Sequence, residues 1–236
     1  MALPKLKSQV YELEQPSTGE KIKYRPFLVK EQKVLMMASE SEDEKQIRDA
    51  LAGIISSCTY EKVDPFNVPM FDVEFLFLRI RGKSVGEKIE LNLLCPDDNE
   101  TRVKTNLNLD DVGVNQKLGH TNEISITDKI KIIMNYPTLN DMVGMNGGEN
   151  AGIDEVLDMI KRCVHEIHDG ETVHSKIDMS ESDLNEFIES LTTEQFESLT
   201  NFFDTMPKVA HSIEVTNPKT KKKGEVVIEG IQSFFG

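Results

Sequence analysis

The stretch Phe71–Ile80, FDVEFLFLRI, constrains the fold most, because it is the densest apolar run in an otherwise acidic, lysine-rich chain. Seven of its ten residues are apolar, and burying them contributes roughly 10–20 kcal/mol before conformational entropy is subtracted. A helical period places Phe71, Phe75 and Leu78 on one face and further apolar side chains on another. We therefore predict a helix, with a short strand as the competing interpretation. A helix that is apolar on nearly all sides lies at the centre of a module or in an interface.

The ends of this helix are predicted from its neighbours. Asp72 is a plausible N-cap, and Gly82-Lys83-Ser84 reads as a polar turn. The same tripeptide is similar to the end of a phosphate-binding loop. The upstream glycine that such a loop requires is replaced by Phe77, so the sequence argues against a nucleotide site.

Short alternating segments and amphipathic segments follow one another, which is typical of an α+β fold. We predict helices combined with several short antiparallel β-hairpins. The strands fall in 9–14 with 21–25, 88–94 with 101–109, 123–134, and 211–216 with 224–229. The helices fall in 30–39, in a segment ending at Cys58 that Ser41 or Asp43 caps, in 152–168, after a cap at Ser180, and after a cap at Thr192 or Thr193.

Two of the hairpins each follow a Phe-rich helix and carry an X-Pro pair at the tip, Cys95-Pro96 and Asn217-Pro218. This weak echo predicts two helix-plus-hairpin modules. We place them at 1–145 and 146–236, joined by the glycine-rich segment around Asn146–Ala151.

Composition excludes several classes of function. The net charge of -14 argues against nucleic acid as the main partner, because phosphate binding needs concentrated positive charge. No apolar run reaches the ~18–20 residues of a membrane span, and we expect no signal peptide. Three distant cysteines suit free thiols in a reducing cytoplasm. The single basic cluster, Lys219–Lys223, is expected to be a solvated hairpin tip.

The best candidate metal site combines Cys163, His165, His168 and His174. Cysteine and histidine are good zinc ligands, and a helix would bring two of these histidines together. The spacing differs from that of zinc proteases, so the favoured interpretation is surface histidines near a helix C-terminus. We expect no catalytic residue, no cofactor and no metal. The Cys95-Pro96 tip, half of a zinc-ribbon pattern, is expected to be metal-free.

Four segments together resemble the baseplate protein family of T-even-like tailed bacteriophages, which includes hub subunits and a hub assembly factor. They are PSTGEKIKYRPFLVKEQKVLMMASES, FDVEFLFLRIRGKSVGE, the Cys95-Pro96 hairpin and the closing GIQSFF. The likeness is strongest over Leu3–Leu109 and at the C-terminal tail. It also implies a Cys-x-x-Cys pair at the hairpin, of which only Cys95 is present, so a zinc role is in doubt.

The resemblance implies a non-enzymatic protein that acts in assembling the central baseplate hub through protein–protein contacts. Expected partners are other baseplate hub or tail proteins, the tape-measure protein, or further copies of the chain. The expected locations are the host cytoplasm during assembly and the virion tail baseplate. Two alternatives stay open: a tail-assembly chaperone for the tape-measure protein, absent from the mature virion, and a small metal-dependent enzyme.

Aromatic and aliphatic side chains are the candidates for partner binding. A terminal pair of phenylalanines suits docking onto a partner, although folding back onto the chain's own core is an equally good interpretation. The candidates are Phe71, Phe75, Leu78, Phe234 and Phe235.

Overall fold

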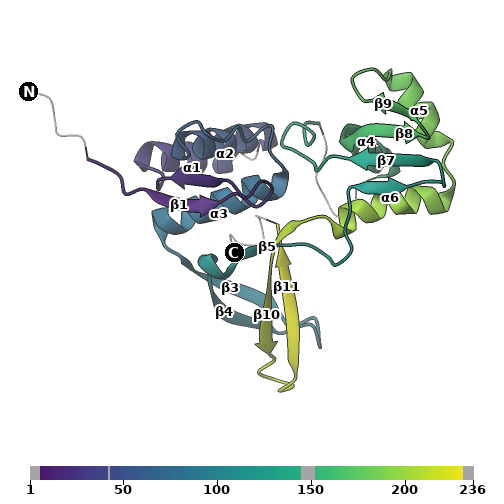
Figure 1. Cartoon of the computed structure of the whole chain (residues 1–236). Helices are drawn as coiled ribbons and strands as arrows, with labels where there is room; N and C mark the ends of the chain where they lie inside the picture. Colours follow the sequence, from purple (N-terminus) through teal and green to yellow (C-terminus); the bar gives the residue numbers. More distant parts are fainter. Residues whose placement is uncertain (1–5, 42, 145–151, 231–236) are drawn as a thin grey trace, which may run out of the picture. The chain divides into compact units, whose positions relative to one another are not determined.

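A computed structural model describes residues 6–41, 43–144 and 152–230 of the chain. Its helices and small antiparallel sheets confirm the predicted α+β class (Figure 1). The chain forms two compact units. Unit 1 comprises Met1–Asn115 with Lys208–Gly236, and unit 2 comprises Gln116–Pro207. The division expected from the sequence differs from these units: its boundary at 145 lies inside unit 2, and it separates the terminal hairpin from unit 1.

Unit 1 begins with a hairpin and three helices. Strands β1 (Tyr11–Glu14) and β2 (Lys21–Tyr24) pair antiparallel. Helix α1 (Val29–Ser41) packs on α2 (Glu44–Cys58), and α2 packs on α3 (Met70–Val85). The Asp43 carboxylate caps α2 by accepting hydrogen bonds from two backbone amides of its first turn, as the sequence predicted.

Helix α3 is the centre of unit 1, which confirms the helical prediction for the apolar run. Its buried apolar side chains are Phe71, Val73, Leu76, Phe77, Leu78 and Ile80. Both predicted ends were wrong. Pro69 occupies the N-cap, and the helix continues through the expected turn to Val85, because Gly86, at φ 118°, supplies the conformation that ends it.

Asp72 lies buried in the first turn of α3 and holds the tip of the first hairpin instead of capping the helix. Its Oδ2 accepts a hydrogen bond from Gln15 Nε2 at 2.6 Å, and its Oδ1 accepts one from the Ser17 amide at 3.0 Å. The Ser17 hydroxyl also donates to this carboxylate. A buried carboxylate needs such donors, so Asp72 joins the hairpin to the central helix.

Two longer hairpins complete unit 1. Strands β3 (Lys88–Leu94) and β4 (Arg102–Asn108) form one, and β10 (Lys208–Thr216) and β11 (Lys223–Glu229) form the other. The short helix η1 (Leu109–Asp111) leads to β5 (Gly113–Asn115), which pairs with β10. The second sheet therefore has the order β11-β10-β5. Figure 1 shows the two hairpins side by side.

Three hairpins have the same type of turn at their tips. In each turn, a proline follows the first residue after the strand. Three residues beyond that proline, the chain adopts a positive φ: 72° at Gly19, 51° at Asn99 and 62° at Lys221. In each turn the amide of the positive-φ residue donates to the carbonyl of the residue before proline. The pairs are Gly19 to Gln15, Asn99 to Cys95 and Lys221 to Asn217.

Two of these tips, those of β3–β4 and β10–β11, hold each other. The buried Asn217 side chain donates from Nδ2 to Asp97 Oδ1 at 2.8 Å and to Asp98 Oδ2 at 2.9 Å. Thr220 Oγ1 donates to Asp97 Oδ2 at 2.5 Å. Hydrogen bonds from Thr101, from the Glu100 amide and from Asn217 hold the pKa of Asp98 well below its usual range. We call these four residues, Asp97, Asp98, Asn217 and Thr220, the hairpin clasp.

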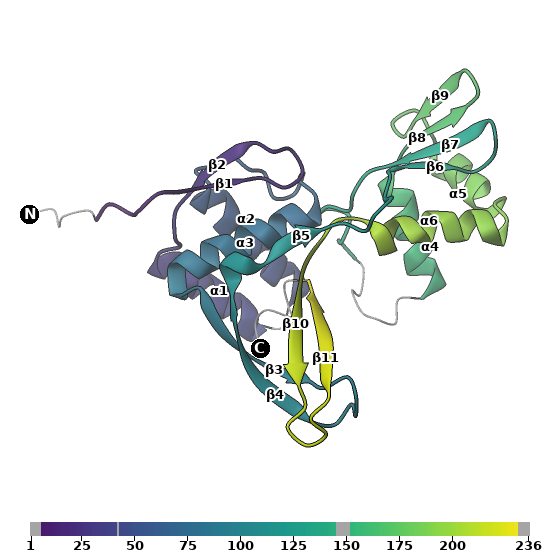
Figure 2. The ribbon, with the colours of Figure 1, turned by 60° about the horizontal axis from the view of Figure 1, so that its bottom comes forward.

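Unit 2 is a four-stranded antiparallel sheet with helices on one face (Figure 2). The sheet order is β6 (Glu123–Ser125), β7 (Ile130–Met134), β8 (Val164–Asp169) and β9 (Thr172–Ser175). Helices α4 (Ile153–Cys163), α5 (Glu181–Glu189) and α6 (Thr193–Thr205) enclose the core with the sheet. The predicted caps Ser180 and Thr192 are confirmed, and Thr192 forms a full capping box with Gln195.

The prediction of one helix from 152 to 168 was wrong in its second half. The helix ends at Cys163, and the chain continues as strand β8. Val164 pairs with Met134 and Ile167 pairs with Ile132, while His165 is an extra residue in the ladder. This bulge lets two side chains three residues apart face the same core, which produces the spacing of a helix.

The predicted link at Asn146–Ala151 lies outside the described residues, as does the terminal Phe234-Phe235 pair. Within the described parts of the chain, no helix combines the length and apolar character needed to cross a membrane.

Candidate protein-binding surfaces

Helix α1 presents apolar side chains to solvent. Val29, Val34, Met36 and Met37 are 81%, 50%, 57% and 59% exposed. The buried residues of this helix are instead Glu31 and Ala38. Methionine adapts its shape to different partners, and grouped exposed apolar side chains mark interaction sites. We call the four exposed residues the α1 surface.

The inward side of α1 is held by an ion pair that is shielded from solvent. Arg25 Nη2 lies 3.0 Å from Glu31 Oε1, and the two side chains are only 11% and 7% exposed. The same nitrogen donates to Ser57 Oγ at 2.9 Å, and Arg25 Nη1 donates to the carbonyl of Pro26 at 2.9 Å. Glu31 Oε2 accepts from the Leu28 amide at 2.7 Å. This network ties the start of α1 to the end of α2.

The ionisation of Glu31 follows from these contacts. Burial alone would raise its pKa, but hydrogen bonds from Arg25, from the Leu28 amide and from Lys30 outweigh burial and lower the pKa to about 2. Glu31 is therefore a carboxylate at neutral pH, and its charge fixes α1. Burial raises the pKa of the neighbouring Cys58 thiol to about 11, which keeps it protonated and unreactive.

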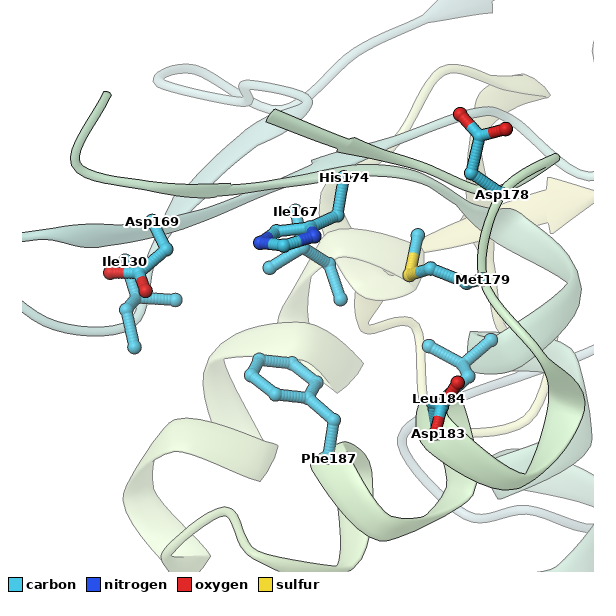
Figure 3. Close-up of a pocket in the computed structure, with 9 residues that line it drawn as sticks. All are labelled: Ile130, Ile167, Asp169, His174, Asp178, Met179, Asp183, Leu184 and Phe187. Atoms are coloured by element: carbon cyan, nitrogen blue, oxygen red, sulfur yellow. The ribbon is translucent and has the colours of Figure 1, made fainter. Parts of the chain in front are cut away.

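Unit 2 carries a second candidate surface, a groove of about 460 Å³ between the sheet and α5. Figure 3 shows Ile167 and His174 on one side of the opening and Phe187 across from them. Its full lining is Ile130, Ile167, Asp169, His174, Asp178, Met179, Asp183, Leu184 and Phe187. Pockets of this size accept small ligands or side chains of a partner.

The predicted partner-binding residues of α3 lie mainly inside unit 1. Phe71 and Leu78 are 5% and 1% exposed, so their side chains belong to the core of their own unit. Phe75 is partly buried, and the Arg79 guanidinium lies 4.6 Å from its ring centroid. In this fold, only Phe75 of the three offers part of its surface to a partner.

The four candidate metal ligands lie in different environments. Cys163 is buried in the core of unit 2, where burial raises its pKa to about 12. His165 and His168 lie on strand β8, not on a helix, and His168 Nε2 lies 2.8 Å from Glu166 Oε2. His174 faces the groove from β9. Across the described ranges, no three metal-binding side chains come together.

Sequence reasoning missed two features of the structure. The first is His120, whose ring nitrogens lie 3.0 Å from Thr205 Oγ1 and 3.1 Å from Tyr136 Oη. These partners are far apart in the chain, so no local pattern indicates them. The α1 surface did have a signal, because Val34, Met36 and Met37 cannot all face inward from one helix.

Comparison with protein families gives one extended match. The family model described as T4 bacteriophage base plate protein matches residues 8–236 and thus spans both units. A search of curated proteins and a search of solved structures found no match.

Proposed function

Since the chain belongs to the T4 bacteriophage base plate protein family, we propose that it is a non-enzymatic protein that assembles the central baseplate hub through contacts of the α1 surface. Family membership fits a place in the virion tail. The proposed sequence of events is that the chain meets other hub or tail proteins in the host cytoplasm and brings them into the growing baseplate.

One observation carries this proposal: α1 buries the charged residue Glu31 and leaves four of its apolar residues, those of the α1 surface, exposed to solvent. A helix that served only the core of unit 1 would bury its apolar side chains. Here the Arg25–Glu31 pair holds the helix in place, while Val29, Met36 and Met37 stay accessible. The segment 16–41 that contains this helix also carries much of the resemblance to baseplate proteins.

Charge adds to the argument for a specific partner. Lys33 is exposed on α1 beside the apolar side chains, while Lys30 lies 3.3 Å from Glu31, in a chain whose net charge is -14. An acidic partner is repelled by most of this protein, but it meets positive charge at α1. We therefore expect the partner segment to be apolar with acidic residues at its edge.

Affinity purification of the tagged chain from infected cells tests the proposal. The informative variant is Val29→Ser/Met36→Ser/Met37→Ser, which changes exposed side chains and has little effect on stability. Val227→Ser is a matched control, because Val227 is 56% exposed on β11 of the same unit. Hub proteins should co-purify with the wild type and with the control, and their yield should fall with the triple variant.

Three outcomes would count against the proposal. The α1 surface is not the binding site if the triple variant retains the same partners at the same yield. If the tape-measure protein is recovered in place of hub proteins, the chain is a tail-assembly chaperone instead. Recovery of further untagged copies alone would indicate self-association.

A further inference from the structure

We propose that the groove of unit 2 binds a segment of another protein in which apolar side chains are flanked on both sides by lysine or arginine. This inference concerns a different surface from α1 and a partner of opposite charge, so it goes beyond the function proposed above.

The middle of the groove is apolar and opens onto the core of unit 2. Ile167 and Leu184 belong to that core, and Ile130, Met179 and Phe187 pack against it while remaining partly accessible. The His174 ring lies beside Ile167 and faces Phe187 (Figure 3). An apolar side chain that entered here would lose its contact with water and gain contact with these five apolar residues.

Carboxylates stand at both ends of the apolar middle. Figure 3 shows Asp169 beside Ile130 at one end, and Asp178 and Asp183 at the other end near Met179 and Leu184. None of the three takes part in an ion pair within the described ranges of the chain. Asp183 lies in the first turn of α5 and accepts a hydrogen bond from the Ser180 hydroxyl, a neutral donor, at 2.6 Å.

The described lining of the groove contains three aspartates and no lysine or arginine, and three cations beyond its edge have other hydrogen-bond partners. Lys161 Nζ lies 2.6 Å from Asp158 Oδ1, and Arg162 Nη1 donates to the Asp141 carbonyl at 2.7 Å. The Lys176 ammonium donates to the Arg162 carbonyl. The ends of the groove are therefore negative, and positive side chains of a partner would complement them.

The basic stretch Lys219–Lys223 of a second copy reads KTKKK and contains no apolar side chain to fill the groove. The chain also carries Leu6 between Lys5 and Lys7, and Leu6 is 96% exposed, so binding to a second copy is an outcome that the experiment must separate from binding to a different protein. An exposed apolar residue at the rim extends the surface for a longer partner segment: Ile177 is 94% exposed between Lys176 and Asp178. The proposed occupant is a segment of another protein, and selective binding to the chain's own peptide around Leu6 would overturn that choice in favour of a second copy.

An array of short overlapping peptides that covers the tail proteins of the virus tests this inference. The probe is the labelled full-length chain, applied as wild type and as two variants. Asp169→Asn/Asp178→Asn changes two exposed carboxylates, and Phe187→Ala removes the ring that faces His174. Thermal unfolding shows which variants are folded, and the carboxylate variant keeps the test informative if Phe187→Ala is unstable.

Some peptides should bind the wild type but not the folded groove variants. We expect these peptides to contain apolar residues between lysines or arginines. Their affinity should fall by roughly thirtyfold when an anchor contact is removed, and it should weaken with added salt. Glu197→Gln is the matched control, because Glu197 is exposed on α6 and does not line the groove. This variant should bind the same peptides.

The inference is wrong if no peptide depends on the groove residues, or if the dependent peptides are acidic. Equal loss with Glu197→Gln would also contradict it, since that result would indicate attraction to the overall negative charge. The α1 variant Val29→Ser/Met36→Ser/Met37→Ser should bind the array like the wild type. The two proposals can therefore fail independently.

Discussion

At the scale of single residues, Glu31 has the largest consequence for function. It occupies an inward position on α1 that an apolar residue would normally fill, and it is neutralised by Arg25 at 3.0 Å. A buried ion pair contributes little net stability compared with apolar packing, but removal of one partner leaves an uncompensated charge. Glu31 thus helps to fix α1 in one position while the residues of the α1 surface stay exposed.

Glu31→Gln should lower the free energy of unfolding by about 3 kcal/mol, because it leaves the Arg25 guanidinium without its carboxylate in a shielded site. Urea unfolding of the two proteins measures the difference. Glu40→Gln is the control, because Glu40 lies on the exposed side of the same helix and should change stability little. Equal stability of Glu31→Gln and the wild type would show that the pair does not hold α1.

The same residue predicts how stability depends on pH. The carboxyl group of Glu31 has a pKa of about 2 in the folded chain, against an ordinary value of 4.5. The unfolded chain therefore takes up the proton first as the pH falls, and the contribution of Glu31, complete above 4.5, is lost between 4.5 and 2. As the pH falls from 4.5 to 2, the free energy of unfolding should decrease more steeply for the wild type than for Glu31→Gln. Parallel curves would contradict the prediction.

Residue patterns predicted the helices and hairpins well but misplaced some individual roles. The cap Ser180 was predicted correctly, and Asp43 and Thr192 were each one of two predicted candidates, because a cap depends on neighbours within one turn. Asp72 was assigned the same role, yet its partners are Gln15 and Ser17 of a hairpin far away in the chain. Contacts between distant segments leave no local signal.

At the scale of elements, strand β8 shows why a periodic pattern can mislead. The buried residues Ile160, Cys163, Val164 and Ile167 have helical spacing throughout, although the helix ends at Cys163. The bulge at His165 adds one residue to the strand and so reproduces the spacing. The apparent histidine pair of a metal site was a product of this misassigned helix.

Two glycine substitutions test the packing of individual elements. A Cβ atom at Gly224 of β11 would lie 2.5 Å from Cγ of Pro96, next to the hairpin clasp. Gly224→Ala should therefore destabilise the protein by about 1–3 kcal/mol through overpacking.

At Gly53 of α2 no atom lies within 4 Å of an added Cβ, so Gly53→Ala should stabilise the helix by about 1 kcal/mol. Thermal unfolding measures both changes, and the opposite order of stability would refute this account of the packing.

At the scale of the whole molecule, unit 2 is an insertion between two paired strands of unit 1. Asn115, the last residue of β5, is the ladder partner of Lys208, the first residue of β10. The ends of the inserted segment Gln116–Pro207 therefore meet in one sheet. The sequence could not indicate this pairing, since the two residues are separated by the whole of unit 2.

This arrangement predicts that unit 1 folds without the insertion. A variant that joins Asn115 to Lys208 through a short glycine-serine linker should retain a cooperative unfolding transition, because the two ends are already adjacent. Circular dichroism during thermal unfolding checks this outcome. A variant that lacks a transition would show that unit 1 depends on unit 2, contrary to the division into two units.

The central claim is that the α1 surface acts in baseplate assembly, and complementation measures it most directly. Cells that supply Val29→Ser/Met36→Ser/Met37→Ser would be infected with virus lacking its own copy, and infectious particles would be counted. We predict a yield far below that obtained with the wild type or with Val227→Ser, at equal protein levels and equal stability. A full yield with the triple variant would contradict the account.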